Sequence, residues 1–252
     1  MTDFSDAELE RYSRQIILRP MGGTAQVRLK EARVLVIGAG GLGAPLLAYL
    51  AASGVGHITI ADGDTVDVSN LQRQILFSAS DVGRLKAEVA AERILALNPE
   101  IRCEVHPHFV NEDTLPDLMA SHTLVADGSD TFATRLMVSD AAVAARVPLV
   151  SAAVIGFEGQ IGTFAPHIKG VPCYRCFVPE HPGEAAELTC ADLGVFGPAV
   201  GVMGSLQAAE VIRVLTGMDG QLTGAVTLFD MTSTSLRTLA LKPDPACPSC
   251  AS

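Results

Sequence analysis

The chain has 252 residues and a formal net charge of −10 at pH 7, with 18 Lys and Arg residues against 28 Asp and Glu residues. This length is enough for one large α/β domain or two small ones. Hydrophobic residues make up 48% of the chain and the mean hydropathy is +0.33, which excludes a disordered protein. The acidic balance argues against a nucleic-acid partner, because such a partner requires a basic surface.

The first residues are polar and acidic and contain no apolar run typical of a signal peptide. The longest apolar segment, residues 195–215, is interrupted by Gln207, Glu210 and Arg213. These polar and charged side chains disfavour a membrane span and favour a buried or interface helix. We therefore expect a cytoplasmic protein without a membrane partner.

In chain order, the pattern first predicts two short helices within residues 5–31, broken around Pro20 to Gly23. Strands and helices then alternate, with strands expected at 33–37, 57–61, 101–105, 122–126 and 148–152. The intervening helices are expected at 42–53, 82–97, 112–120 and 130–146. This alternation is typical of a doubly wound, Rossmann-like α/β fold with a parallel sheet.

After residue 151 the pattern changes. Residues 158–165 alternate with period two, as in an antiparallel strand, and a loop rich in Pro, His and Glu follows. A helix beginning near Gly194 and strands at 225–230 and 235–241 complete the chain. We predict a mixed sheet in one domain over 1–252, with N-terminal helices at 1–31, a nucleotide-binding core at 32–152 and an antiparallel extension at 153–252.

A glycine turn separates the first predicted strand from the following helix, and its glycines are Gly38, Gly40, Gly41 and Gly43. Glycine lets the backbone approach a phosphate, and the helix that follows presents free N–H groups and a favourable dipole. The next strand ends in Asp62, whose carboxylate suits ribose hydroxyls. A turn that only packs helix against strand is the alternative. The pattern predicts nucleotide binding, but it does not separate NAD, FAD or SAM from ATP.

Polar residues downstream favour a triphosphate. Arg73 and Lys86 could both neutralise phosphate charge, and Asp130 follows a predicted strand at the sheet edge where ligands bind. Asp130 is therefore placed to hold Mg²⁺. Each residue also has a purely structural alternative: Arg73 as a solvated loop residue, Lys86 as an exposed helix lysine and Asp130 as a helix N-cap. Their joint placement at one sheet edge favours the functional reading.

Four features occur together and in order: Arg11-Tyr-Ser-Arg14-Gln-Ile, the glycine turn, Ser69-Asn-Leu-Gln-Arg-Gln74 and two Cys-x-x-Cys pairs. In this combination the sequence, from about residue 6 to residue 250, resembles the MoeB/ThiF family of ubiquitin-activating-type adenylyltransferases. That family uses ATP to adenylate the C-terminal Gly-Gly carboxylate of a small ubiquitin-like sulfur carrier, with release of pyrophosphate. The resemblance implies Mg²⁺, a role in molybdopterin or thiamine biosynthesis, and carrier and zinc binding by residues 153–252.

The resemblance also implies roles for single residues. Gly41 would back the phosphates, and Asp62 would bind the ribose. Arg14 is similar to the arginine that the family inserts into the ATP site of the partner subunit, which implies a homodimer. This chain has Thr131 where the family has Asn. The Thr131 hydroxyl would therefore have to replace the contact that the Asn side-chain amide makes near the nucleotide or metal. The candidate catalytic residues are Arg14, Arg73, Lys86, Asp130 and Cys190, and the candidate nucleotide-binding residues are Gly38, Gly40, Gly41, Gly43, Asp62, Asp64, Asn70, Arg73, Gln74, Lys86, Asp130 and Thr131.

The pairs Cys173-Tyr-Arg-Cys176 and Cys247-Pro-Ser-Cys250 are of the kind that binds tetrahedral Zn²⁺. Disulfides and a redox Cys-x-x-Cys motif are the alternatives. Four thiolates leave no open coordination position, so the predicted zinc is structural. Cys103 lies within a predicted strand and is expected to belong to the core.

Cys190 has no cysteine nearby in the sequence. The resemblance places it where the family carries a potentially nucleophilic cysteine on a crossover loop. An ordinary small apolar residue near a helix start is the alternative. We expect it to be dispensable for adenylation, because Glu187 and Asp192 oppose a thiolate and no Lys or Arg lies near it in the loop.

Two other functions compete with the adenylyltransferase. An NAD-dependent oxidoreductase could use the same glycine turn, although Asn70, Arg73 and Lys86 suit a triphosphate better than nicotinamide. A non-catalytic, nucleotide-dependent scaffold for a ubiquitin-like partner is the third reading. No rhodanese-like segment follows Cys250, so sulfur is expected to come from a separate protein.

Overall fold

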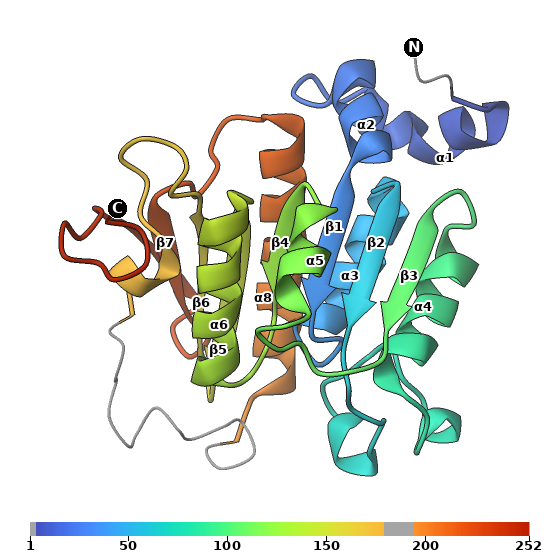
Figure 1. The fold of residues 1–252 in the computed structure, drawn as a ribbon. Coiled ribbons are helices and arrows are strands. Elements are labelled where there is room, and N and C mark those ends of the chain that lie inside the picture. Colours follow the sequence, from blue (N-terminus) through green and yellow to red (C-terminus); the bar gives the residue numbers. More distant parts are fainter. Residues whose placement is uncertain (1–3, 179–193, 252) are drawn as a thin grey trace.

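The computed structural model describes residues 4–178 and 194–251. They form an eight-stranded sheet in the order β3-β2-β1-β4-β5-β6-β7-β8, with helices on both faces (Figure 1). The strands are β1 (Arg33–Ile37), β2 (His57–Ala61), β3 (Arg102–His106), β4 (Leu124–Asp127), β5 (Leu149–Ile155), β6 (Glu158–Phe164), β7 (Ala225–Asp230) and β8 (Ser235–Ala240). Strands β1 to β5 pair in parallel and β6 to β8 pair antiparallel, which confirms the predicted mixed sheet.

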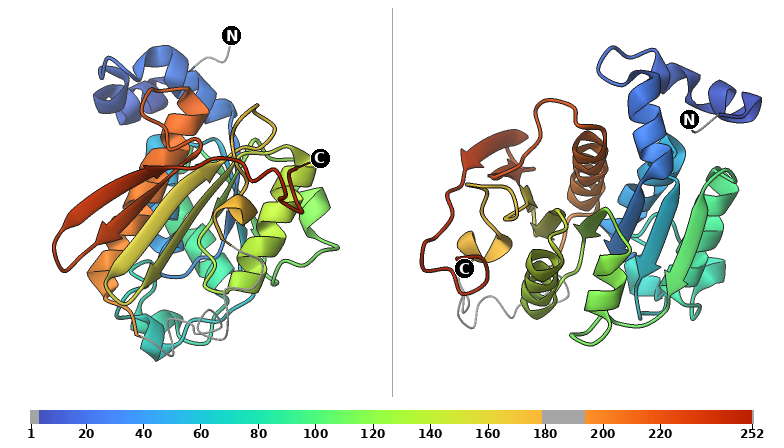
Figure 2. Two further views of the ribbon diagram at one scale, coloured as in Figure 1. Left: turned by 90° about the vertical axis from the view of Figure 1, so that its left-hand side faces the viewer. Right: turned by 45° about the horizontal axis from the view of Figure 1, so that its top comes forward.

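Apolar side chains on the two faces of the sheet form two cores, each covered by its own helices (Figure 2). One face is covered by α3 (Gly43–Ser53), α4 (Lys86–Leu97) and α8 (Gly197–Thr216). The other is covered by α5 (Leu115–Ala120), α6 (Phe132–Ala145) and the short 3₁₀ helix η3 (Tyr174–Cys176). Two further 3₁₀ helices, η1 (Val68–Asn70) and η2 (Ala79–Asp81), lie in the long connection between β2 and α4. The parallel strands β1, β2 and β4 are buried on both faces, which explains their almost continuous apolar sequences, whereas β3 at the sheet edge is largely exposed.

Two predicted helices begin later than expected. The helix predicted from residue 82 begins at Lys86, because Leu85 is extended and forms an isolated bridge with Thr65. The helix predicted from residue 112 begins at Leu115, because the side chain of Asn111 accepts hydrogen bonds from the backbone of Asp113 and Thr114. In both cases local polar or strand-like bonding replaces the first turn of the helix.

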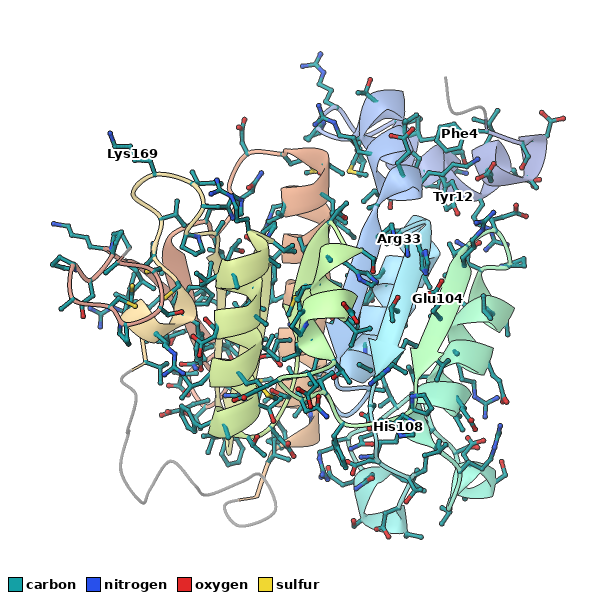
Figure 3. All side chains as sticks on the ribbon, viewed as in Figure 1. Phe4, Tyr12, Arg33, Glu104, His108 and Lys169 are labelled. Atoms are coloured by element: carbon teal, nitrogen blue, oxygen red, sulfur yellow. The ribbon has the colours of Figure 1, made fainter. Side chains whose placement is uncertain are left out.

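The N-terminal helices α1 (Asp6–Ile16) and α2 (Gly22–Glu31) confirm the predicted break between them. Helix α1 packs at the C-terminal end of α4, where Arg11 donates to the carbonyl of Leu97 (3.0 Å) and Asn98 donates to the Tyr12 hydroxyl (2.9 Å). Figure 3 shows Tyr12 and His108 at opposite ends of the sheet. Helix α1 therefore lies at the amino-terminal edge of the parallel strands.

Among the described residues, α8 is the one helix long and apolar enough to cross a membrane by length and composition, and half of it is buried inside the protein. Its Gln207 side chain is fully buried and donates to the carbonyl oxygens of Asp127 (2.8 Å) and Val150 (3.1 Å). These bonds fasten α8 to the carboxyl ends of β4 and the start of β5. Helix α8 is therefore a core helix that packs against one face of the sheet.

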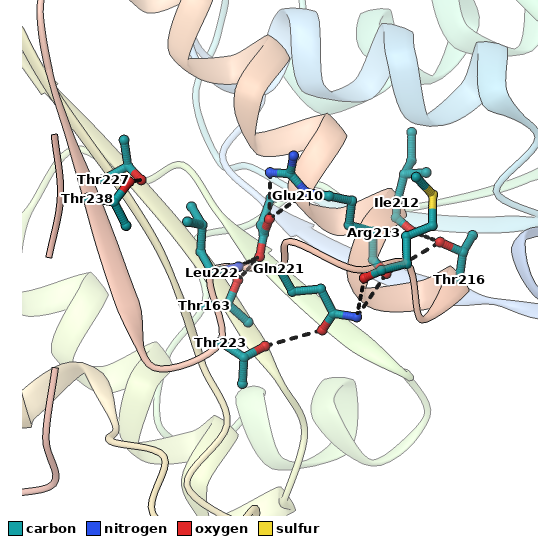
Figure 4. A network of polar contacts seen from close by, with 11 residues as sticks. Thr163, Glu210, Ile212, Arg213, Thr216, Gln221, Leu222, Thr223, Thr227 and Thr238 are labelled. Carbon is teal, nitrogen blue, oxygen red and sulfur yellow. Dashed lines mark hydrogen bonds and ion pairs between the residues drawn. The ribbon is translucent and has the colours of Figure 1, made fainter. Parts of the chain in front are cut away.

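A buried carboxylate joins α8 to the antiparallel half of the sheet (Figure 4). Glu210 is fully buried, and one of its oxygens accepts from the Thr163 hydroxyl and the Leu222 backbone N–H, both at 2.6 Å. The other oxygen accepts two bonds from the Arg213 guanidinium, at 3.0 and 2.7 Å. Charge pairing and four hydrogen bonds together offset the cost of burying this carboxylate.

We predict that Glu210→Ala lowers the free energy of unfolding by about 3 kcal/mol, because Thr163, Leu222 and Arg213 all lose their partner. Urea denaturation measures the change. The control is Glu92→Ala, which removes an exposed pair with Arg84 and is expected to cost less than about 1 kcal/mol. Equal losses in the two variants would contradict a structural role for the Glu210 network.

Candidate active site

The glycine turn between β1 and α3 has the close packing expected of a phosphate-binding turn. Gly38 has φ +88°, and a Cβ on Gly43 would overlap the carbonyl oxygen of Gly38. A Cβ on Gly41 would lie 2.6 Å from the Val200 side chain of α8. Larger residues at these positions would force α8 or the turn to move. The bare backbone of the turn lines a cavity of about 210 Å³ at the carboxyl ends of the parallel strands.

The Asp62 side chain stabilises the glycine turn through hydrogen bonds. Its carboxylate accepts hydrogen bonds from the backbone N–H groups of Ala39 (2.7 Å) and Asp64 (2.8 Å). Burial raises the pKa of Asp62, while these two N–H groups and the charge of Lys86 act in the opposite direction. The side chain also lines the cavity, so lone pairs that the turn does not use are available to a bound hydroxyl.

Three basic side chains line the cavity: Arg73, Lys86 and Arg135. Lys86 is only 6% exposed and its Nζ lies 2.9 Å from a carboxylate oxygen of Asp64, so the alternative of an exposed helix lysine is wrong. Arg73 is half-buried and donates to the carbonyl of Ser69 (3.1 Å). Arg73 and Lys86 line the same cavity as the glycine turn, so both charges are available to a polyphosphate.

Asn70 has a local structural role in η1, and its predicted contact with the nucleotide stays a prediction. Its side chain accepts a hydrogen bond from the backbone of Asp67 (3.3 Å) in a capping box of η1, and it is not among the cavity-lining residues. Gln74 does line the cavity, and its buried Oε1 has no hydrogen-bond partner. The hydroxyl of Ser129, also in the lining, is buried without a partner as well. Such unpaired groups fit a cavity shaped for a polar ligand.

The residue that caps the N-terminus of α6 lies in the segment after β4. Thr131 is the N-cap, and its hydroxyl accepts from the Thr134 backbone N–H at 3.2 Å. The alternative of Asp130 as the N-cap is therefore wrong. Asp130 is exposed and lines the cavity beside Thr131, so its carboxylate is available to a cation that accompanies phosphate.

A second cavity of about 420 Å³ lies next to the first, over β5, β6 and β7. Arg135 and Val154 line both cavities and therefore mark their junction. Arg135 is 5% exposed, and two of its guanidinium nitrogens donate to the carbonyl of Ser129 at 3.0 and 2.7 Å. The sequence analysis missed this arginine. The available signal was a basic residue, Arg135, early in the helix predicted to follow Asp130.

Asp127 is a second functional candidate that the sequence analysis missed. It is fully buried, and its carboxylate accepts from the backbone of Ser129 (3.0 Å) and from the hydroxyl of Ser151 (3.1 Å). Burial raises the pKa of Asp127, and the charge of Arg135 opposes this shift. An aspartate as the last residue of a buried strand was the signal that could have revealed it.

The predicted zinc ligands come together in space. Sγ–Sγ distances are 3.9 Å for Cys173 and Cys176, 3.5 Å for Cys173 and Cys247, and 3.5 Å for Cys176 and Cys250, and all four sulfurs lie within 4.8 Å of one another. Thiolates around one tetrahedral Zn²⁺ lie about 3.8 Å apart for Zn–S bonds of ~2.3 Å. The donor set and spacing fit one such ion. Pairing into disulfides does not match these distances.

Of the two remaining cysteines, Cys103 lies in the part of the chain that the structure describes, and it is not a member of this cluster. Cys103 is half-buried on β3 and packs against the apolar core, as expected, and burial raises the pKa of its thiol to about 12. Cys190 lies outside the described residues. Its predicted place on a crossover loop stays a prediction.

Arg14 lies far from the cavity of its own chain. It is exposed in the last turn of α1, which packs against the C-terminal end of α4, whereas Lys86 at the first position of α4 lies in the cavity. A 12-residue helix such as α4 is about 18 Å long. An arginine side chain cannot span that distance.

A family model matches residues 12–249, almost the whole chain, and its description is "ThiF family". The chain belongs to the ThiF family. This membership confirms the resemblance inferred from the motifs, and it agrees with the glycine turn, the two cations and the four-cysteine cluster. It also removes the NAD-dependent oxidoreductase as a competing family.

Individual ThiF-family relatives are similar over nearly their full length. A "Sulfur carrier protein adenylyltransferase" of Thermus thermophilus is 46% identical, with 96% of this chain and 91% of that protein covered. The "Molybdopterin-synthase adenylyltransferase" of Escherichia coli is 43% identical, with 99% of both chains covered. The "Sulfur carrier protein ThiS adenylyltransferase" of Escherichia coli is 42% identical, covering 98% and 96%. Some relatives are longer, and the chain spans as little as 51% of their length.

The fold agrees with that of a solved structure of E. coli MccB with ATP. The two chains have a TM-score of 0.82 and 26% sequence identity over 96% of this chain and 75% of the other. This likeness confirms the mixed, Rossmann-like sheet for a member of the ThiF family.

Proposed function

We propose that this protein adenylates the C-terminal carboxylate of a small ubiquitin-like sulfur carrier, using Mg·ATP and releasing pyrophosphate. The observation that carries the proposal is the junction at Arg135. There a cavity lined by the glycine turn, Arg73 and Lys86 meets a larger cavity over the antiparallel strands. The first cavity suits a nucleotide and the second suits an extended polypeptide end.

Each part of ATP has a matching group in the first cavity. Phe109 and Val110 provide an apolar wall for the base, and Asp62 provides acceptors for the ribose. The phosphates lie against the glycine turn between Arg73 and Lys86. Asp130 would hold Mg²⁺, which would supply further charge neutralisation to the phosphates.

The reaction needs positioning more than acid–base chemistry. A carboxylate oxygen of the carrier attacks the α-phosphorus, and the bond from that phosphorus to the pyrophosphate oxygen breaks. The carboxylate is already ionised at neutral pH, so no proton has to be removed. Arg73 and Lys86 hold the phosphates and stabilise the charge that moves onto the departing pyrophosphate.

The next part of the proposal concerns which sulfur carrier the protein adenylates. The relatives named for molybdopterin synthase and for ThiS are 43% and 42% identical, so similarity alone does not choose between the two pathways. We propose that the carrier is MoaD-like or ThiS-like, and that the protein acts in the cytoplasm, where unpaired cysteines stay reduced. Co-purification of the small partner would identify it.

We predict ATP–pyrophosphate exchange in the presence of the carrier. Asp130→Ala and Arg73→Ala should each lower the exchange rate by ~10²-fold or more, because each removes charge stabilisation of the transferring phosphate. Asp113→Ala, an exposed carboxylate before α5, is the control and should keep the wild-type rate. A wild-type protein that binds ATP and carrier without exchange would instead favour a scaffold.

We further propose an active homodimer in which Arg14 enters the cavity of the partner subunit. The distance of Arg14 from its own cavity supports this arrangement. Arg14→Ala and Asp130→Ala should both be inactive as pure proteins. A hybrid dimer then has one intact site, so an equal mixture should recover about a quarter of the wild-type exchange rate. No recovery after demonstrated subunit exchange would place the whole site in one chain.

The four-cysteine cluster is proposed to hold one structural Zn²⁺ per chain. Elemental analysis of reduced protein should give one zinc, and Cys176→Ser should lower both zinc content and the thermal midpoint, because three thiolates bind the ion more weakly. Cys103→Ser, which changes a cysteine outside the cluster, should retain the zinc. Absence of zinc from freshly prepared wild-type protein would falsify this assignment.

A further inference from the structure

The floor of the second cavity contains a row of side chains that crosses four strands. Strand register places Ala153 of β5 opposite Gln160 of β6, Gln160 opposite Leu228 of β7, and Leu228 opposite Arg237 of β8. All four residues line the cavity, so their side chains share the face of the sheet that α6 covers. The row therefore forms a track that runs across the antiparallel strands.

One end of this row meets the nucleotide cavity. Val154, next to Ala153 on β5, lines both cavities together with Arg135. Arg237 lies at the other end, on β8, which is the outer strand of the sheet. Neighbouring strands are ~4.8 Å apart, so the steps from β5 to β8 place Arg237 about 14 Å from the junction. An extended chain rises ~3.3 Å per residue, so about four residues span that distance, and one or two more reach a phosphate beyond the junction.

Arg237 is an exposed cation that the chain leaves available for a ligand. Its diagonal neighbour across β7 and β8 is Asp230, but that carboxylate accepts hydrogen bonds from the backbone of Thr232 (2.8 Å) and the hydroxyl of Ser233 (2.6 Å). Among the residues that the structure describes, no acidic side chain forms an ion pair with Arg237. An unpaired arginine at the outer end of a cavity suits an acidic group on the molecule that enters it.

We propose that Arg237 is a specificity-determining residue: it pairs with an acidic side chain of the carrier that lies roughly four to six residues before the terminal glycine. This inference rests on the proposed function, because it assumes that the carrier's C-terminal tail follows the row to the junction. The arginine then selects for the position of the acid as well as for its charge. The alternative is that Arg237 only discourages other strands from pairing with the free edge of β8, and this role does not depend on where a peptide carries its acid.

Fluorescent synthetic peptides that end in a free Gly-Gly carboxylate test the proposal by anisotropy without ATP. One Glu is moved along an otherwise neutral peptide. Glu about five residues before the terminal glycine should give about fivefold tighter binding than Glu about two residues before it, because only the first reaches Arg237. The difference should vanish in Arg237→Ala and diminish with added salt. The matched control is Arg102→Ala, at an exposed arginine of the opposite edge strand β3, which removes the same charge and should keep the difference.

Charge reversal decides whether the arginine itself reads the peptide. Arg237→Glu should bind a peptide with Lys at the favoured position about fivefold more tightly than one with Glu there, which reverses the wild-type preference. Arg102→Glu changes the net charge equally and should keep the wild-type preference. Equal wild-type affinity for both Glu positions, or an unchanged preference in Arg237→Glu, would overturn the proposal. Failure of the proposed function gives a different result, because the wild-type protein would then bind the Gly-Gly acid no more tightly than its C-terminal amide.

Discussion

The close approach of α8 to the glycine turn is the constraint on which the rest of the site depends. Gly41 leaves room for Val200, and Gly204 of α8 in turn leaves no space for a Cβ against the backbone of Leu42. From the same helix, Gln207 bonds to the carboxyl end of β4. A helix from the antiparallel half thus supports the nucleotide turn of the parallel half, so neither half forms the site alone.

Much of the fold could be predicted from the sequence because its signals are local. Runs such as Val34 to Ile37 and the turn from Gly38 to Gly43 fix strand, turn and helix within a few residues. The two Cys-x-x-Cys pairs are likewise recognisable from the spacing of the cysteines within each pair. The positions of helix starts were less predictable, since the starts at Lys86 and Leu115 depend on bonds to Thr65 and Asn111 rather than on periodicity.

The less predictable parts of the site depend on tertiary contacts. In the sequence Lys86 could be an ordinary surface lysine, and only the structure shows that it is buried and paired with Asp64. Arg135 draws attention only once the two cavities meet at it. Propensity and spacing describe neighbours along the chain, whereas these roles belong to neighbours in space.

The four-cysteine cluster also has a topological consequence. Its ligands come from residues 173–176 and 247–250, and the chain between them includes α8, β7 and β8. A bound metal would close this segment into a ring, as a crosslink does, and would remove conformational freedom from the unfolded chain by ~4 kcal/mol in the loop-entropy description of such rings. The two strands at the sheet edge and the helix beneath the glycine turn would then unfold as one cooperative unit.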